Sequence, residues 1–484
     1  MLFNSIEFII FLPVVFAAYW CAARHLRIQN ALVVVSSYVF YGWWDWRFLT
    51  LIAFTSAWSF VAGRLEASRM ERKLPGSKVI LTVSLLVNLG ILGFFKYFNF
   101  FAETLIDVLG SIGLHVDIIT VRIILPVGVS FYTFQALSYT IDVYRRQIAP
   151  TKDAVAFFAF ISFFPQLVAG PIERATNLLP QFLVERRFDH GEAVMGCRQM
   201  LWGFFKKTVI ADTCAVIANG VFNDWMACGG GALVVGALAF TLQIYGDFSG
   251  YSDIAIGCGK LFGIRLMQNF DHPYFSRSIA EFWRRWHISL TTWFRDYLYI
   301  PLGGSRCGKA RQIRNTFAIF LVSGLWHGAN WTFVMWGFYH ACCFLPLMLL
   351  KTNRKYATEV VGGNRFLPGF RNGGRIIFTF CMVVFGWLIF RSPNLHTLWG
   401  WLGRICGSFQ RGYFYGIPHS VSWTDTLVLI PLFIVVEWLT RAWQHPLEHM
   451  PKAKCIRWGI YVVLILLIGV FMPPGKETFI YFQF

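Results

Sequence analysis

The sequence predicts an all-α membrane protein that crosses the bilayer many times, and three observations support this fold class. The chain has 484 residues, of which 56% are hydrophobic and only 14% are charged, whereas soluble domains carry about 25% charged residues. Long segments contain no charge, and in the longest, Asn315 to Leu350, 36 residues pass without a Lys, Arg, Asp or Glu. Basic residues concentrate in the short segments between the apolar ones.

Apolar segments recur along the whole chain and predict about 11–13 crossings within a single membrane domain, residues 1–484. A helix needs about 20 apolar residues to cross the hydrocarbon, so the shorter segments are expected to be re-entrant or broken helices. Such helices occur only where protein or water satisfies the backbone. The candidate segments are 5–22, 31–45, 47–63, 79–95, 97–113, 123–142, 153–170, 195–219, 231–258, 315–326, 329–350, 374–392, 425–443 and 456–472.

The net charge of +18 is explained by cytoplasmic loops, because Lys and Arg accumulate on the cytoplasmic side of membrane proteins. Segments 64–78, 174–207 and 265–314 are expected to be cytoplasmic, and the first helix is expected to begin outside. No basic domain exists apart from the membrane segments, which excludes a nucleic-acid-binding function. The eleven cysteines include no CxxC pair, so neither a disulfide framework nor a zinc site is predicted.

His327 is the first candidate for chemistry, because it lies in the longest uncharged segment, 13 residues after Arg314. If those residues are helical, the rise is about 20 Å, which places His327 near the middle of the bilayer. An ionisable side chain at that depth is a functional hypothesis by default. Gly328 and Asn330 indicate a helix break of the kind that lines cavities. The alternative is a structural histidine bonded to a neighbouring carbonyl.

His287 is the second candidate and lies in an aromatic, basic segment. Helical spacing places Trp283, His287, Leu290 and Phe294 on one face, with Arg284 and Arg285 pointing elsewhere. This pattern suits the cytoplasmic interface, where aromatic rings lie at headgroup depth and Arg meets phosphate. The alternative is an interfacial amphipathic helix without a chemical role.

A third cluster, Tyr245 to Asp253, follows an apolar segment and contains Asp247 and Asp253. Carboxylates near membrane depth need partners such as Arg or hydroxyl groups. The two aspartates either support the site or bridge helices, and the sequence leaves both readings open.

Several long motifs resemble the membrane-bound O-acyltransferase family, and within it the branch of bacterial alginate O-acetyltransferase membrane subunits. The resemblance runs from near residue 5 to the C-terminus, and the motifs occur in the order of the family. The motifs are residues 125–134, 164–171, 247–253, 282–290, 293, 295–304 and 327–333.

The resemblance implies helices around a central tunnel and transfer of an acyl group from a thioester to a hydroxyl group. The family's membrane histidine maps onto His327 and its second site residue onto His287. In this branch the donor is cytoplasmic acetyl-CoA, the acceptor is an envelope polysaccharide outside, and an extracytoplasmic SGNH or esterase-like partner completes the transfer. The implied location is the bacterial cytoplasmic (inner) membrane.

The residues fit this chemistry, because a histidine can remove the hydroxyl proton near neutral pH. Arg284 and Arg285 are expected to hold the phosphates of coenzyme A, and Trp286 to line the mouth of the site. The last seven residues, 478–484, are aromatic and uncharged. They resemble a tail motif associated with acyl relay, in which Tyr481 would carry the acetyl group as an ester. The alternative is that this tail only anchors by packing.

Two other functions stay open at this stage. One is D-alanyl transfer from a carrier protein to teichoic acid, within the same family. The other is a non-enzymatic glycan channel or transporter, because a broken helix around His327 would also suit a transport site. The sequence does not identify the acceptor polysaccharide.

Overall fold

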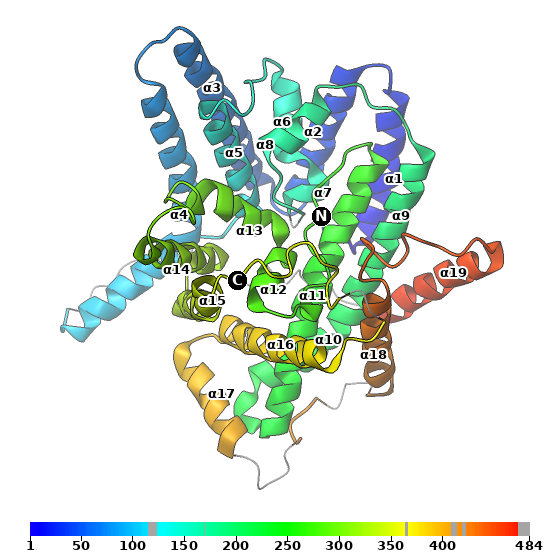
Figure 1. Cartoon of the computed structure of the whole chain (residues 1–484). Helices are drawn as coiled ribbons and strands as arrows, with labels where there is room; N and C mark the ends of the chain where they lie inside the picture. Colours follow the sequence, from blue (N-terminus) through cyan, green and yellow to red (C-terminus); the bar gives the residue numbers. More distant parts are fainter. Residues whose placement is uncertain (115–122, 169, 364–365, 408–413, 419–422, 473–484) are drawn as a thin grey trace. The chain divides into compact units, whose positions relative to one another are not determined.

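A computed structural model of the protein describes residues 1–114, 123–168, 170–363, 366–407, 414–418 and 423–472. Helices joined by loops make up this part of the chain (Figure 1). These residues contain no β-strand. The chain divides into two compact units, one formed by 1–196 with 258–267 and the other by 197–257 with 268–484. The all-α prediction is confirmed, and the single membrane domain over 1–484 stays a prediction.

The first unit contains the N-terminal helices, which pack in sequence-neighbouring groups. Helix α2 packs on α6, and α3 packs on both α4 and α5. Its helices are α1 (Ile6–Cys21), α2 (Leu26–Gly42), η1 (Trp46–Phe48), α3 (Leu49–Glu71), α4 (Ser77–Ser111), α5 (Val129–Tyr144), α6 (Ala154–Ser162), α7 (Phe164–Leu167), α8 (Ala175–Phe182) and most of the first half of α9 (His190–Phe205).

Local sequence signals set several of these helix ends. The side chain of Ser5 accepts a hydrogen bond from the Phe8 backbone N–H and caps α1, and Asp153 caps α6 in the same way through Ala156. Such side chains satisfy backbone donors that the first helical turn leaves without partners. Polar tertiary bonds then join the helices, as where Arg186 donates to Asn30 Oδ1 at 2.6 Å.

The second unit contains the helices on which the candidate residues lie. Helix α11 (Gly230–Leu261) ends in the first unit but has most of its length here. The other elements are η2 (Lys206–Ala211), α10 (Asp212–Asn223), η3 (Trp225–Ala227), η4 (Pro273–Phe275), α12 (Ile279–Arg285), α13 (Ile288–Phe294), η5 (Arg295–Tyr299), α14 (Lys309–His327), α15 (Trp331–Leu349), α16 (Phe370–Arg391), α17 (Leu395–Gly407), α18 (Trp423–Leu439) and α19 (Lys454–Phe471).

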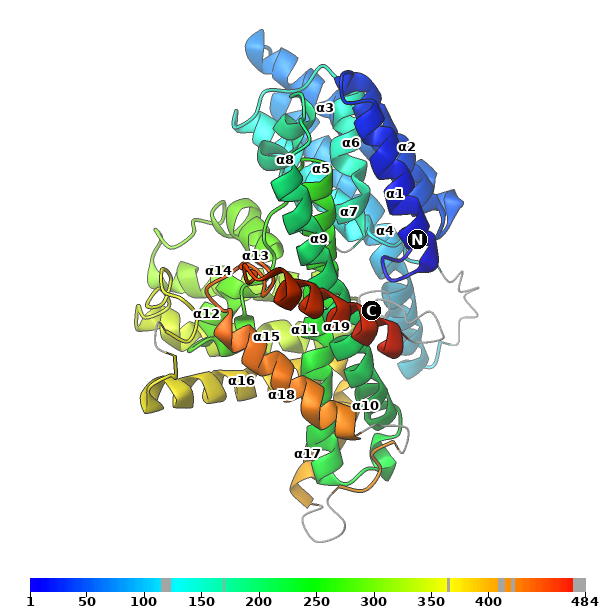
Figure 2. The same cartoon turned by 90° about the vertical axis from the view of Figure 1, so that its right-hand side faces the viewer.

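Helices α14 and α15 form a hairpin, and α15 lies between α14 and α16, an order that both views show (Figures 1 and 2). The hairpin is tight because glycines occupy its crossing points. A methyl group at Gly324 would collide with the Phe333 carbonyl, and one at Gly337 would collide with the Phe320 carbonyl. The side chain of Asn330 caps the start of α15 by accepting from Thr332 N–H at 3.1 Å. This close packing fixes the end of α14, where His327 lies.

Six helical segments among the described residues are long and apolar enough to cross a membrane, which confirms a polytopic membrane protein. They are Trp46–Glu71, Ser77–Ser111, Gly230–Leu261, Trp331–Leu349, Phe370–Arg391 and Lys454–Phe471. Two further apolar helices, Ile6–Cys21 and Thr426–Leu439, are shorter. The expected total of 11–13 crossings therefore stays a prediction.

Most of the apolar segments found in the sequence coincide with helices, but three boundaries were wrong. Segments 79–95 and 97–113 form one continuous helix, α4. Segment 153–170 is divided between α6 and α7, and 195–219 is interrupted by the π-helical turn η2. Hydropathy records apolar length, and it does not record where a backbone bends inside an apolar segment.

Candidate active site

The segment around His287 is broken, which corrects the expectation of one continuous amphipathic helix. Helix α12 ends at Arg285 and α13 begins at Ile288. Between them His287 has φ 45° and ψ 55°, in the left-handed region. A non-glycine residue is uncommon in this region and persists only where its surroundings hold it there. His287 is therefore placed by tertiary contacts and not by helical periodicity.

Asn269 supplies those contacts. Its backbone carbonyl accepts from Ile288 N–H at 2.9 Å, across the break. Its side-chain oxygen lies 3.0 Å from His287 Nδ1 and accepts from the Ser289 hydroxyl at 2.9 Å. The Phe248 ring completes the setting, with its plane perpendicular to the imidazole and its centroid 4.6 Å from that of the imidazole. His287 is consequently held in one position.

The imidazole of His287 is buried and neutral. Only 1% of the residue is exposed, and burial lowers the pKa of His287 to about 3, because a charged imidazolium loses its hydration there. Its Nε2 has no hydrogen-bond partner among the described residues. A buried neutral imidazole with one nitrogen unengaged is suited to accept a hydrogen bond from a hydroxyl group.

His327 is the last residue of α14, and Gly328 follows it in extended conformation. The helix break expected from Gly328 and Asn330 is confirmed. The imidazole is 7% exposed and stands edge-on to the rings of Trp336 and Phe390, with both centroids at 5.2 Å. Its depth near the middle of the bilayer stays a prediction.

Both histidines line one cavity of about 920 Å³ in the second unit. Trp326 contacts both of them, with its ring centroid 6.1 Å from that of His287 and 5.0 Å from that of His327. Trp283, Leu290 and Phe294 also line this cavity, so the residues expected on one face meet despite the broken helix. A cavity of this size suits an organic ligand, since ligand sites measure about 300–1,000 Å³.

The cavity has a basic lining. Five arginines line it against two carboxylates, a balance that favours an anionic ligand. Arg284 and Arg285, which were expected to point away from His287, line the same cavity as His287. The charged lining residues are Asp271, Arg284, Arg285, Arg295, Arg354, Glu359 and Arg441.

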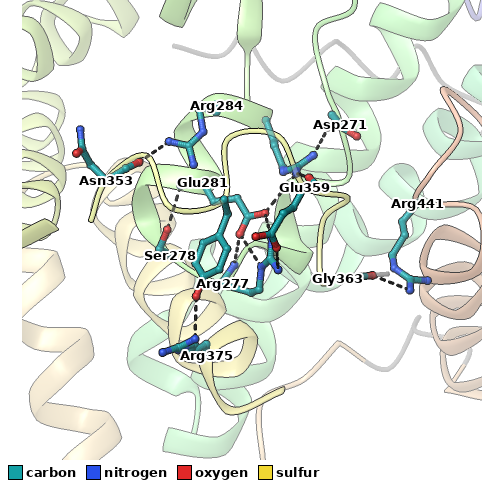
Figure 3. Close-up of polar contacts among 12 residues, drawn as sticks. Asp271, Arg277, Ser278, Glu281, Arg284, Asn353, Glu359, Gly363, Arg375 and Arg441 are labelled. Atoms are coloured by element: carbon teal, nitrogen blue, oxygen red, sulfur yellow. Dashed lines mark hydrogen bonds and ion pairs between the residues drawn. The ribbon is translucent and has the colours of Figure 1, made fainter. Parts of the chain in front are cut away.

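The two predicted phosphate-binding arginines differ in how much of their bonding capacity is already used (Figure 3). Arg285 pairs with Asp271, bonds Glu281 at 3.3 Å and donates to the Glu359 carbonyl at 2.6 Å. Arg284 donates from Nη1 to the Asn353 carbonyl at 2.6 Å, and its Nη2 has no partner among the described residues. Arg284 thus retains donors for a ligand, whereas the charge of Arg285 is balanced.

Arg277 anchors a segment of the cavity lining, residues Asn353 to Glu359 (Figure 3). It forms ion pairs with Glu281 at 3.0 Å and with Glu359 at 2.7 Å, and its guanidinium lies 3.9 Å from the Tyr356 ring centroid. Residues Asn353 to Glu359 are thereby fastened to α12. This segment and its Arg354 were not among the predicted site residues, although the basic character of the segment is visible in the sequence.

Trp286 lines the cavity but is chiefly a packing residue. It is 1% exposed and stacks on Phe282 with centroids 5.6 Å apart. Phe270 and Trp387 contact its other sides at 5.0 and 4.7 Å. Its predicted role at the mouth of the site stays a prediction.

The third cluster bridges helices. Lys207 of η2 pairs with Asp247 of α11 at 2.8 Å, and Lys206 pairs with Asp253 at 2.5 Å. Gln199 adds a hydrogen bond to Asp253 at 2.9 Å. Neither aspartate lines the cavity. Of the two readings left open by the sequence, this geometry favours helix bridging.

The C-terminal tail and metal binding are the two remaining points of the sequence prediction. Tyr481 lies outside the described residues, so its predicted role as an acyl carrier stays a prediction. Within the described ranges, no group of three His, Cys, Asp or Glu side chains is arranged to hold a metal ion. The site is therefore described by its two histidines, Asn269 and the basic lining.

Comparison with known proteins identifies related sequences. A model of the membrane-bound O-acyltransferase family matches residues 146–389. The chain is 44% identical to a probable alginate O-acetylase of Pseudomonas putida over 398 residues, 82% of this chain and 78% of that protein. It is 33% identical to a peptidoglycan O-acetyltransferase of Helicobacter pylori over 536 residues, which cover 100% of this chain and 98% of that protein. A teichoic acid D-alanyltransferase of Bacillus subtilis is 26% identical over 289 residues, which cover 56% of this chain and 69% of that protein.

Proposed function

The chain belongs to the membrane-bound O-acyltransferase family and is an acyltransferase, and from that premise we propose its donor, its acceptor and its catalytic residues. The donor is acetyl-CoA, bound from the cytoplasm. The acetyl group moves towards hydroxyl groups of an extracytoplasmic polysaccharide at the bacterial inner membrane, with an SGNH or esterase-like partner completing the transfer outside.

The observation that supports this proposal is the meeting of His287 and His327 at one basic cavity. Acetyl-CoA carries several phosphate charges, and arginine binds phosphate through paired N–H donors. Arg284 retains such donors, and Arg354 lines the cavity from the segment anchored by Arg277. The histidines then lie where the thioester end of the donor would reach.

The reaction needs a base, because a neutral hydroxyl group is a weak nucleophile. His327 takes the hydroxyl proton while the oxygen attacks the thioester carbonyl. The new C–O bond forms, the C–S bond breaks, and the leaving thiolate takes the proton from the imidazolium. A positioned base of this kind contributes about 10²–10⁴ in rate, and the second imidazole, His287, orients the reacting groups.

Transfer across the membrane poses a geometric problem that the C-terminal tail would solve. The hydrocarbon core is about 30 Å thick, so a donor inside and a glycan outside do not meet directly. A hydroxyl carrier such as Tyr481 would take the acetyl group beside His327 as an ester and pass it outward. In that case the first acceptor is a tyrosine of this chain and the polysaccharide is the final one.

D-alanyl transfer is the alternative within the family. The teichoic acid D-alanyltransferase of Bacillus subtilis aligns with 56% of this chain at 26% identity, whereas the alginate and peptidoglycan O-acetylating relatives align with 82% and 100% at higher identity. The broader match favours acetyl transfer. A non-enzymatic channel is excluded by membership of an acyltransferase family.

The test uses purified protein in nanodiscs and follows release of the coenzyme A thiol from acetyl-CoA. Release that depends on His327 and appears together with acetylated protein or acceptor supports the proposal. A D-alanyl carrier protein is offered in parallel as the competing donor. Thiol release from acetyl-CoA equal in wild type and H327A, or transfer only from the D-alanyl carrier, would contradict it.

A further inference from the structure

Asn269 has a role that neither the sequence motifs nor the family assignment predicts. It lies between α11 and η4, outside any helix, and is fully buried. A buried amide is costly unless its hydrogen bonds are made. Each bond of its side-chain oxygen leads to His287 or to the residue two positions after it.

The orientation of the Asn269 amide follows from its partners. The backbone N–H of Ser289 can only donate, and it points at Oδ1 over 3.3 Å. On the other side Nδ2 donates to Ser252 Oγ at 3.2 Å. A reversed amide would place an NH₂ group against the Ser289 N–H, donor against donor. The atom facing His287 Nδ1 is therefore a carbonyl oxygen.

A carbonyl oxygen offers only lone pairs, so the His287 nitrogen beside it must carry the hydrogen. In a neutral imidazole the other nitrogen, Nε2, then has the lone pair. Nε2 has no partner among the described residues, and His287 lines the cavity. We propose that Asn269 is a positioning residue, which fixes His287 as the Nδ1–H tautomer and presents the Nε2 lone pair as a hydrogen-bond acceptor that orients the hydroxyl group in the acyl transfer.

The surroundings of His287 make the neutral character of Asn269 important. The groups packed against the ring are Phe248 of α11, Phe270, Trp326 of α14, Asn269 and Ser289. The same cavity is also lined by His327 and by seven charged residues, of which Asp271 and Arg285 are paired with each other. The seven are Asp271, Arg284, Arg285, Arg295, Arg354, Glu359 and Arg441. No carboxylate is bonded to the ring within the described residues. An amide orients the ring without stabilising its protonated form, whereas an aspartate would do both.

This inference rests on the proposed function for its chemical meaning, but its first test does not depend on activity. Protein labelled with ¹⁵N-histidine is compared with H287Q, and the signal lost in that variant identifies His287. The expected result is protonation at Nδ1 in wild type and in S252A, which leaves Oδ1 in place. Loss of that preference is expected in N269L. An Nε2–H tautomer in wild type, or an unchanged spectrum in a folded N269L, would overturn the proposal.

The second test separates positioning from folding by kinetics. N269D keeps the acceptor oxygen, so we expect it to retain turnover, whereas N269L loses about 10- to 100-fold in kcat with little change in KM for acetyl-CoA. The carboxylate in N269D stabilises the imidazolium, so the pKa of His287, followed by its ¹⁵N signals, is expected to rise above that in wild type. An unchanged pKa of His287 in active N269D would refute the positioning role. Wild-type protein with the Nδ1–H tautomer but no thiol release would instead refute the proposed function.

Discussion

His287 and His327 line one cavity and both pack against the indole of Trp326. They come from separate breaks in the helical backbone, one in the left-handed turn after α12 and the other at the end of α14. Two imidazoles at one cavity allow one to act as a base while the other orients the reacting groups.

Replacing His327 with alanine is expected to lower acetyl transfer by at least about 100-fold, the contribution of a positioned base. The protein should still insert into the membrane, because the hairpin is held by close packing at Gly324 and Gly337. The measurement is thiol release by purified protein, together with polysaccharide acetylation in cells. H396A, at an exposed residue, is the matched control. Near wild-type transfer in H327A would remove His327 from the mechanism.

Arg284→Gln and Arg285→Gln should have different consequences. Arg284 retains donors, so its loss should raise KM for acetyl-CoA but not for acetyl-pantetheine, which lacks the adenosine phosphates. Arg285 balances the carboxylates of Asp271 and Glu281, and breaking a buried pair costs about 3–5 kcal/mol. R285Q should therefore lower thermal stability. Equal KM changes with both donors in R284Q would show that Arg284 does not bind the phosphates.

Tyr481→Phe keeps the ring and removes only the hydroxyl group. If Tyr481 carries the acetyl group, polysaccharide acetylation in cells is lost while the amount of protein in the membrane stays the same. Mass spectrometry of the C-terminal peptide should then find an acetyl adduct in wild type and none in the variant. Full acetylation in Y481F would leave the aromatic tail with a packing role only.

The buried neutral His287 predicts that stability falls as the solution becomes acidic. Its pKa is about 3 in the folded protein and about 6.5 in an unfolded chain. Between these values the unfolded state binds the proton and the folded state does not, so stability is lost as pH falls below about 6.5. The loss is up to about 1.4 kcal/mol per pH unit.

H287Q cannot titrate, and its melting temperature should therefore fall less than that of wild type between about pH 7 and about pH 5. H396Q, at an exposed residue, provides the comparison. If the melting temperatures of wild type and H287Q fall equally with pH, the buried imidazole is not what makes the protein acid-sensitive.

Ser305 lines the cavity and is exposed, so it reports on which side of the membrane the donor enters. In S305C, an impermeant thiol reagent should label inverted vesicles but not intact cells, because the basic segment around it is expected to be cytoplasmic. Labelling of the unsubstituted protein is subtracted. Acetyl-CoA should protect the site. Ready labelling from outside would reverse the proposed orientation.

The helices were largely predictable because each apolar segment must bury its backbone bonds internally in a membrane. The break after His327 was predictable as well, since glycine and a capping asparagine mark helix ends locally. The break at His287 was not, because nothing in residues 282–290 departs from a helical pattern. Its left-handed turn depends on bonds from Asn269, 18 residues away in the sequence.

The sequence by itself determined the helical membrane class and the family, and it nominated the two candidate histidines, because apolar length and ordered motifs are properties of the chain. Tertiary structure alone decided which groups surround those histidines. It placed Arg284 on the cavity, balanced Arg285 with Asp271, and set the oxygen of Asn269 against His287. The physical reason is that hydrogen-bond partners and charge balance depend on distances of a few ångströms between segments far apart in sequence, and periodicity records only neighbours along one helix.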